Sequence, residues 1–448
     1  MESPIHDFVR KYAESGRSRL HMPGHKGVGP LGCERLDITE IDGADSLYTA
    51  NGVIERSERR AAELFGSRRT FYSTGGSSQC IKAMLHIALQ RRAAGGRALV
   101  LAARNVHTAF VHAAALIDFD VEWLWQEQGE EYQLLRCVVG AEALERALLR
   151  LPRLPDAVYV TSPDYLGQLQ PVDELTEVCH RYNVPLLVDN AHGAYLHFLP
   201  KPLHPMDLGA DLCCDSAHKT LPVLTGGAYL HLSEIPESDA GVRRALSLYG
   251  STSPSYLTLQ SIDLCNAYLA DEFRSRLAET VDRVTALKTE LTARGWTVED
   301  TEPLKLVIRA EGSGMSGSDI ARRLRRGLVE CEYSDPDYVV MMFSPQNVAE
   351  DYARILGSLP HHEGAGVGAV TRRAPLSMSP PERVTSIREA LFSPWEEIPV
   401  AEAVGRVCAA PTVSCPPAVP ISVCGERIGT DAAAVFAHYG IETVCVLR

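Results

Sequence analysis

The sequence predicts an α/β fold built around a mainly parallel sheet, and three observations support this. Short apolar runs alternate with helical patterns between residues 55 and 270. Two of these runs end in side chains that suit a ligand at the edge of a sheet. The composition, 45% hydrophobic and 23% charged, can build a large core. Alternation of this kind forms βαβ units whose sheet is covered on both faces.

Residues 1–30 are predicted to form an ordered N-terminal arm. They are rich in Gly, Pro and His around His21–Gly27, and a Pro-Gly pair does not fit a helix. The N-terminus lacks the apolar stretch of a signal peptide, and no later run reaches ~18 apolar residues, so we expect a cytoplasmic protein without a membrane partner. The formal charge of −13 argues against nucleic acid as a partner.

Residues 31–270 are predicted to form the large domain. Its strands are expected where Val, Leu and Tyr gather, and its helices where apolar residues recur every three or four positions. The strand candidates are Arg97–Ala102, Ala157–Thr161, Pro185–Asp189 and Asp211–Cys214, and the helix candidates include Ser77–Gln90 and Val172–Tyr182.

Two further domains are predicted beyond the large one. A long charged helix over Tyr268–Arg294 leads into a small α+β domain, residues 271–360, with a helix around Ser318–Leu328. A Gly- and His-rich break follows. Residues 361–448 carry many prolines but too many apolar side chains for a free tail, so they predict a separate C-terminal domain.

Asp189 and Lys219 are the strongest chemical signal. Asp189 ends a buried apolar strand, which places its carboxylate at the sheet edge where α/β folds bind ligands. Lys219 follows the next strand. An acid for a pyridinium nitrogen and a lysine for a Schiff base are the groups that pyridoxal phosphate requires. Taken alone, the acid is equally typical of a helix cap, and the lysine of a protein surface.

The turn at Gly76, Ser77 and Ser78 is a candidate phosphate site. It runs into the helix expected up to Gln90, and free N–H groups at a helix start suit a phosphate. A plain Gly-rich turn with a Ser cap is the alternative. The Gly-Lys-Ser/Thr element of a Walker motif is absent.

No metal site is predicted. His192, His197 and His204 are spaced by five and seven residues across a strand and loop, which does not bring three rings to one ion. The twelve cysteines form no Cys-x-x-Cys pair and predict buried, reduced thiols. Glu330 and Glu332 predict a solvated face, with binding of a substrate cation as the alternative.

Nearly the whole chain resembles the Orn/Lys/Arg decarboxylase family, in particular its shorter members. The most specific match is Ser216–Pro222, with its Ser-Ala-His-Lys. The other matching blocks are His21–Lys26, Asp37–Glu40, Gly43–Leu47, Arg104–His107, Ser162–Gly167, Thr252–Tyr256, Gly405–Arg406, Pro416–Pro417 and Gly425–Glu426.

This resemblance implies a fold of the aspartate-aminotransferase-like type (fold type I) and pyridoxal 5'-phosphate as cofactor. Lys219 would carry the cofactor, Asp189 would pair with its ring nitrogen, and His107 would stack on the ring above Ala191. The remaining cofactor contacts implied are Gly76, Ser77, Ser78, His192, Ser216, His218, Thr252 and Ser253. Because the last two would reach a neighbouring subunit's phosphate, the resemblance implies a homodimer or higher homo-oligomer with shared active sites.

The implied reaction is decarboxylation of an amino acid, with arginine, lysine or ornithine as the implied substrate. Departures from the family pattern concern the substrate more than the cofactor: Asn190 stands in place of Glu, Tyr195 in place of His, and Thr225–Gly227 in place of Thr-Gln-x. An aminotransferase or another pyridoxal-phosphate enzyme would use the same acid, lysine and phosphate turn. A non-catalytic regulatory homologue is the alternative from another class.

Overall fold

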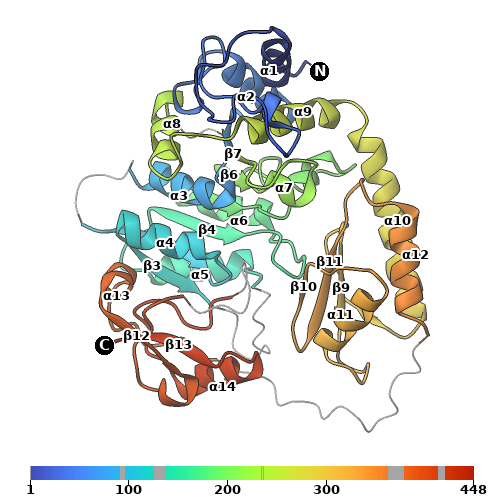
Figure 1. Cartoon of the computed structure of the whole chain (residues 1–448). Helices are drawn as coiled ribbons and strands as arrows, with labels where there is room; N and C mark the ends of the chain where they lie inside the picture. The colour runs from blue at the N-terminus through green and yellow to red at the C-terminus, as the bar shows by residue number, and fades with distance from the viewer. Residues whose placement is uncertain are drawn as a thin grey trace. The chain divides into compact units, whose positions relative to one another are not determined.

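The structure is a computed structural model (Figure 1), which describes residues 2–90, 96–125, 137–233, 235, 237–361, 378–411 and 419–448. The chain divides into two compact units. Unit 1 comprises Met1–Leu101, Gly140–Thr161 and Pro171–Arg274, and unit 2 comprises Ala102–Val139, Ser162–Gln170 and Ser275–Arg448. Pro416 and Pro417 lie outside the described residues. The domain boundaries expected at residues 30, 270 and 360 stay predictions.

A seven-stranded sheet has the order β1-β7-β6-β5-β4-β2-β3. β4, β5 and β6 are parallel neighbours, whereas β7 runs antiparallel to both β6 and β1. The mainly parallel sheet is thereby confirmed, and the expected strands agree with it to within one residue. The bounds are β1 Arg69–Ser73, β2 Ala98–Ala103, β3 Phe119–Leu124, β4 Ala157–Thr161, β5 Leu186–Asp189, β6 Leu212–Asp215 and β7 Ala228–Leu232.

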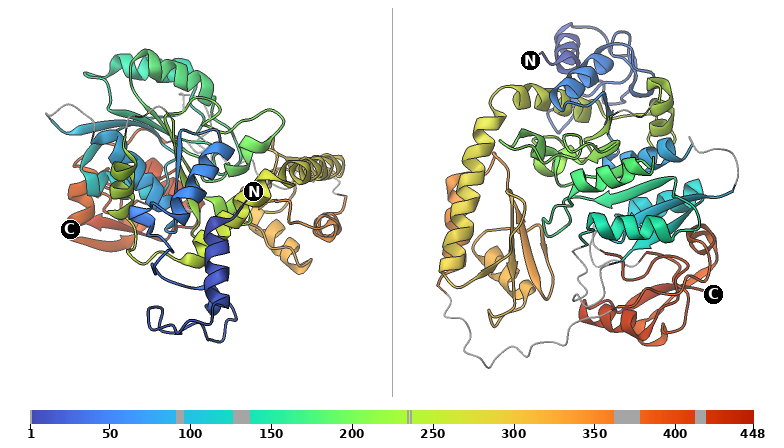
Figure 2. Two further views of the ribbon diagram at one scale, coloured as in Figure 1. Left: turned by 90° about the horizontal axis from the view of Figure 1, so that it is seen from above. Right: turned by 180° about the vertical axis from the view of Figure 1, so that it is seen from behind.

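Helices cover both faces of the unit 1 part of the sheet. α3 (Gly76–Leu89) packs on β5, β6 and β7 and is largely buried. α6 (Val172–Arg181) packs beside α5 (Ala141–Arg150) and covers β5 on the opposite face (Figure 2). α6 presents Leu175 and Val178 to the core and its acidic residues to solvent, as an amphipathic helix should. Other helices are α1 Pro4–Glu14, α2 Val53–Leu64, α4 Thr108–Ile117, α7 Ala217–Thr220 and α8 Asp239–Ser247.

The long charged helix expected over Tyr268–Arg294 is confirmed, but it begins later than expected, because residues 268–270 belong to the helix before it. The structure has two helices, α9 (Tyr256–Ala270) and α10 (Phe273–Ala293). At Asp271 the backbone leaves the helical region, with φ −109° and ψ −85°. The apolar and charged pattern continues across this break, so periodicity alone did not reveal it.

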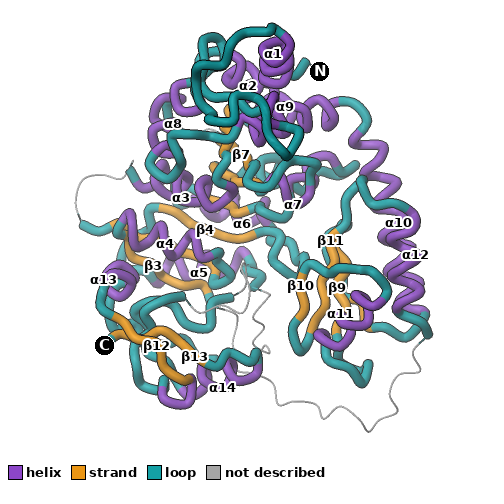
Figure 3. The backbone as a smooth tube through the Cα atoms, viewed as in Figure 1, coloured by secondary structure: helices purple, strands orange, loops and turns teal. Residues whose placement is uncertain are grey.

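Unit 2 contains an antiparallel sheet of order β10-β11-β9-β8. α10, α11 and α12 pack around it (Figure 3). Their shared core with the sheet includes Trp296, Leu306, Ile320 and Val339. The bounds are β8 Thr297–Val298, β9 Lys305–Arg309, α11 Gly317–Arg326, β10 Tyr333–Ser334, β11 Tyr338–Met342 and α12 Ala349–Ser358. This is the predicted α+β arrangement.

The C-terminal segment of unit 2 is built on the antiparallel pair β12 and β13. Its elements are α13 Ile387–Phe392, β12 Trp395–Pro399, α14 Thr430–His438 and β13 Thr443–Leu447. None of the helices in the described ranges combines the length and the apolar character needed to cross a bilayer.

Candidate active site

Asp189 lies at the carboxyl end of β5, where the predicted site begins. Its side chain is fully buried. The Ala191 N–H donates to Oδ1 at 3.1 Å, and the Tyr159 hydroxyl donates to Oδ2 at 3.2 Å. Burial raises the pKa of Asp189, while the nearby Lys219 charge and these hydrogen bonds act in the opposite direction. The result is a shielded carboxylate that holds a proton more readily than a solvated one.

Lys219 lies in α7, one turn beyond the end of β6. Because β5 and β6 are parallel neighbours, with Asp189 opposite Cys214, their carboxyl ends meet at one edge. Lys219 Nζ lies 3.0 Å from His192 Nε2, and His192 is only 1% exposed. The structure thus brings together the predicted Asp189, Lys219 and His192, with the buried Ala191 between the acid and the histidine.

Two segments far apart in the sequence meet at the predicted phosphate turn. The Ser216 hydroxyl donates to the Ser77 hydroxyl at 2.7 Å, and both residues are buried. Gly76 has φ +71°, which favours glycine, and a Cβ there would meet no atom within 4 Å. Its N–H donates to the Gly226 carbonyl at 2.8 Å, so the turn is tied to the loop before β7.

The other predicted residues have different settings. The His218 N–H donates to the Gly227 carbonyl, beside the phosphate turn. Ser78 is partly exposed in the first turn of α3. Thr252 and Ser253 are exposed. His107 lies in unit 2, where its Nδ1 accepts a hydrogen bond from the Ala109 N–H at the start of α4.

The three histidines considered for a metal have separate partners. His192 faces Lys219, His197 pairs with Asp207 at 2.8 Å, and His204 pairs with Asp215 at 3.0 Å. His231 also contacts Asp215, so His204, Asp215 and His231 form a buried cluster. Sequence reasoning did not single out this cluster or Tyr159. The one available signal was that Asp215 directly precedes the Ser216–Pro222 block.

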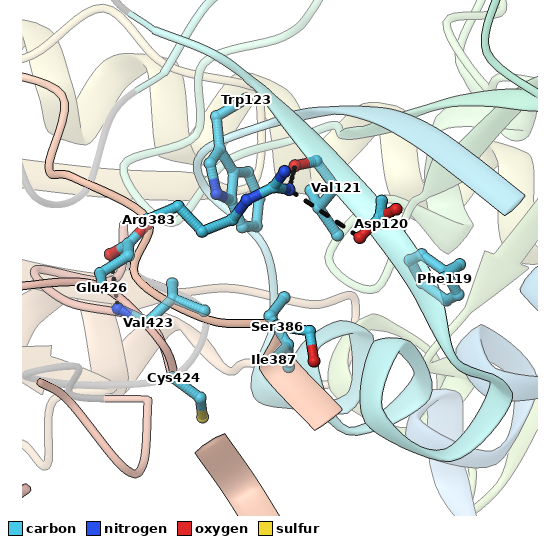
Figure 4. A pocket seen from close by; sticks show the side chains of 10 residues that line it. All are labelled: Phe119, Asp120, Val121, Trp123, Arg383, Ser386, Ile387, Val423, Cys424 and Glu426. Atoms are coloured by element: carbon cyan, nitrogen blue, oxygen red, sulfur yellow. Dashed lines mark hydrogen bonds and ion pairs between the residues drawn. The ribbon is translucent and has the colours of Figure 1, made fainter. Parts of the chain in front are cut away.

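Unit 2 contains two hollows. The smaller has a volume of about 20 Å³, enough for one water molecule. Figure 4 shows Arg383 reaching across it toward Val121, whose carbonyl it contacts at 3.4 Å. The larger has a volume of about 390 Å³ and is lined in part by Glu330 and Glu332. The Tyr165 hydroxyl donates to Glu332 at 3.1 Å, so one of the two predicted acids is held in place.

Comparison with known proteins identifies the family of the chain. The family model described as "Orn/Lys/Arg decarboxylase, major domain" matches residues 3–309. The chain is 30% identical to an arginine decarboxylase of Bacillus subtilis, over 95% of this chain and 91% of that protein. It is 28% identical to an arginine decarboxylase of Halalkalibacterium halodurans, with the same two coverages.

Solved structures show the same fold. A lysine decarboxylase of Pseudomonas aeruginosa superposes with a TM-score of 0.80 and 17% identity, over 99% of this chain and 80% of that one. One from Francisella novicida gives a TM-score of 0.79 and 17% identity, over 100% and 81%. These matches confirm the expected fold class.

Proposed function

The chain belongs to the Orn/Lys/Arg decarboxylase family, and from that premise we propose that it uses pyridoxal 5'-phosphate to decarboxylate a basic amino acid. Several relatives that cover nearly the whole chain are named arginine decarboxylase. Arginine is therefore the substrate we favour over lysine and ornithine, with CO₂ and agmatine as products.

The observation that carries the proposal is the meeting of a buried acid, a lysine and a hydroxyl-lined turn in unit 1. These groups suit the three parts of the cofactor. Asp189 suits the ring nitrogen, Lys219 suits the aldehyde, and Ser77 and Ser216 suit the phosphate. When bound, pyridoxal phosphate accepts the electron pair that remains after CO₂ leaves.

We assign the proton-handling roles to Asp189 and Lys219. Asp189 would keep a proton at the ring nitrogen, because a carboxylate shielded from water stabilises the positive charge of a neighbouring pyridinium. Lys219 returns a proton to the substrate Cα after decarboxylation. The His192 ring, 3.0 Å from Lys219 Nζ, orients that amine.

We assign the phosphate to the N-terminus of α3. The backbone of Gly76, Ser77 and Ser78 lies at the positive end of a fourteen-residue helix. The Ser77 and Ser78 N–H groups are offered to the phosphate, whereas the Gly76 N–H is used by its bond to the Gly226 carbonyl. The Ser77 and Ser216 hydroxyls already lie 2.7 Å apart, and the tie to Gly226 keeps the turn in place. We also assign His218 to the phosphate site, because its N–H donates to the Gly227 carbonyl beside the turn.

The ring and subunit contacts rest on the family pattern. We propose that His107 stacks on the ring, that Ala191 packs beneath it, and that Thr252 and Ser253 reach the phosphate of a second subunit in a homodimer. The exposure of Thr252 and Ser253 leaves them accessible to such a partner. Light scattering of the purified protein tests the dimer, and a monomer at working concentration would overturn it.

We propose Glu332 as the group that binds the distal cation of the substrate. It lines the 390 Å³ hollow, and the Tyr165 hydroxyl fixes one of its oxygens. Glu332→Gln keeps the shape but removes the charge, so KM for arginine should rise about tenfold or more, with kcat less affected. Exposed Glu177→Gln on α6, in unit 1, is the matched control. An unchanged KM in Glu332→Gln would remove this assignment.

The decisive experiment combines an absorption spectrum with CO₂ trapping. Purified protein should show the visible band of bound pyridoxal phosphate, and this band should disappear in Lys219→Ala. One of arginine, lysine and ornithine should release CO₂ and yield the matching amine. A band with a keto acid as product would favour an aminotransferase. A band with no turnover would favour a non-catalytic homologue, and no band after added cofactor would overturn the proposal.

A further inference from the structure

Asp215 is the centre of a buried hydrogen-bond network at the end of β6. Its side chain is 0% exposed, and it accepts hydrogen bonds from four groups, one of which is the Cys213 thiol at 3.7 Å from Oδ1. Asn190 Nδ2 lies 2.7 Å from Oδ1, His204 Nε2 lies 3.0 Å from Oδ2, and His231 Nε2 lies 3.2 Å from Oδ2. His204 Nδ1 accepts from a backbone N–H, so the ring proton is on Nε2 and faces the carboxylate.

Asp215 is held as a carboxylate. Burial opposes its ionisation, but the contacts with His204 and His231 outweigh burial and hold the pKa of Asp215 well below its usual range. The three-residue cluster has ligand atoms within 4.8 Å of one another, as in a metal site. However, the N–H groups of Asn190 and His204 point at the carboxylate, which is the arrangement of a hydrogen-bonded anion.

Asn190 connects this network to the proposed cofactor contacts. Its backbone N–H donates to the Cys214 carbonyl at 2.9 Å, and its side chain bonds to Asp215, so it bridges β5 and β6 twice. It is directly preceded by Asp189. Asp215, in turn, is directly followed by Ser216. A shift of the end of β5 or of β6 would therefore move the Asp189 carboxylate relative to the Ser216 hydroxyl and to Lys219.

The residue type at position 190 is matched to the one at position 215. This chain has an amide, Asn, at position 190 and a carboxylate, Asp, at position 215. A carboxylate at position 190 would lie beside Asp215 at a fully buried position. Two buried carboxylates in contact cannot both remain ionised without a large cost in free energy. The neutral amide supplies a donor in place of this repulsion.

We propose that Asn190 and Asp215 are positioning residues for the cofactor, and that the network with His204 and His231 fixes the ends of β5 and β6 in register. This inference rests on the proposed function, because it assumes that Asp189, Ser216 and Lys219 bind pyridoxal phosphate. The network itself does not touch the cofactor in this assignment. Its effect is transmitted through the two strand ends.

The test measures the dissociation constant of pyridoxal phosphate for the apoprotein, by absorbance titration, beside the melting temperature of the apoprotein. Asn190→Asp should weaken binding about tenfold or more, since it places a second carboxylate against Asp215. Adding Asp215→Asn in the same chain should restore binding to within about threefold of wild type, because the donor and acceptor are then exchanged. Exposed Asn183→Asp is the matched control and should bind as wild type does.

Each outcome bears on a stated claim. If wild type itself fails to bind pyridoxal phosphate, the proposed function is overturned. Equal affinity of Asn190→Asp and wild type overturns the positioning role, as does a lower melting temperature with unchanged affinity. Failure of Asp215→Asn to rescue overturns the pairing. If Asn190→Asp does not fold, Asn190→Ala decides: it should bind several-fold more weakly, and wild-type affinity would refute the role.

Discussion

Tyr159 is a neutral hydroxyl that donates a hydrogen bond to Asp189, the buried acid of the proposed cofactor site. Burial raises its pKa well above the ordinary value, so it remains a donor to Asp189 at every working pH. Tyr159→Phe removes this hydrogen bond while keeping the packing. We expect kcat/KM to fall about three- to tenfold, because one hydrogen bond to a buried charged group is lost. Steady-state decarboxylation assays measure this.

The matched control is Tyr182→Phe. Its hydroxyl donates to Glu145 at 3.0 Å on the helical surface of unit 1, away from the site. That variant should retain wild-type kinetics. If both variants behave alike, the Tyr159 contact does not contribute to turnover.

Asp335 makes the stability of the small α+β part depend on pH. Burial raises the pKa of Asp335 to about 6, against about 3.9 in an unfolded chain. Between these values the folded state binds the proton more tightly, so stability falls as pH rises from about 4 through 6. The loss amounts to at most about 3 kcal/mol. Asp335→Asn should remove this slope.

Hydrogen exchange of β11 across that pH range, corrected for the intrinsic exchange rate, measures the local opening free energy. The exposed Asp282→Asn on α10 is the control and should keep the wild-type slope. An identical slope in Asp335→Asn and wild type would contradict the assignment to this carboxyl.

At the scale of elements, the turn before β7 supports the turn before α3. Gly226 has φ +92°, and a Cβ there would lie 2.9 Å from the Thr74 carbonyl oxygen. Its own carbonyl accepts the Gly76 N–H. Gly226→Ala should therefore shift the phosphate turn, at a strain cost of about 1–3 kcal/mol. We expect pyridoxal-phosphate affinity to fall about tenfold in an absorbance titration.

Gly16→Ala is the matched control, because Gly16 has φ +69° but no atom within 4 Å of its built Cβ. The Gly16→Ala variant has the same kind of backbone strain but no steric clash, so it should bind pyridoxal phosphate as wild type does. Equal affinity in the two variants would show that the contact with Thr74 has no role.

The sequence predicted those elements whose signal is local. β4, β5 and β6 are mainly apolar runs; Asp189 is the last residue of β5, and Lys219 lies one helical turn beyond β6. β1 was not predicted because its buried face includes Thr70 and Ser73. β7 was not predicted either, because the buried His231 interrupts its apolar pattern. Their polar groups are satisfied only by partners distant in sequence, such as Thr70 with His231 at 2.8 Å, and such pairing leaves no local pattern.

At the scale of the whole molecule, one buried ion pair joins distant parts of unit 2. Arg104 donates to both Glu426 oxygens, at 2.6 and 2.7 Å, and is 1% exposed. The rings of Trp123 and Trp125 lie 4.8 and 4.7 Å from its guanidinium carbon. Glu426→Ala would leave the buried Arg104 charge without its carboxylate, so the free energy of unfolding should fall by about 3–5 kcal/mol. Urea denaturation followed by tryptophan fluorescence measures this.

The exposed pair of Arg427 and Glu382 supplies the control. Glu382→Ala should cost less than about 1 kcal/mol. The double variant Arg104→Met with Glu426→Leu should cost less than Glu426→Ala alone, since no charge is then left buried. A double variant as unstable as the single one would contradict this view of the pair.

The sheet order has a consequence for how the chain is made on the ribosome. β1 has β7 as its neighbour, and Arg69 pairs with Leu232. The nascent strand β1 must therefore wait until the codons up to residue 232 have been translated, roughly ten to thirty seconds at usual elongation rates. During this interval the phosphate turn lacks its tie to Gly226. The proposed cofactor site is therefore completed only late in the synthesis of the chain.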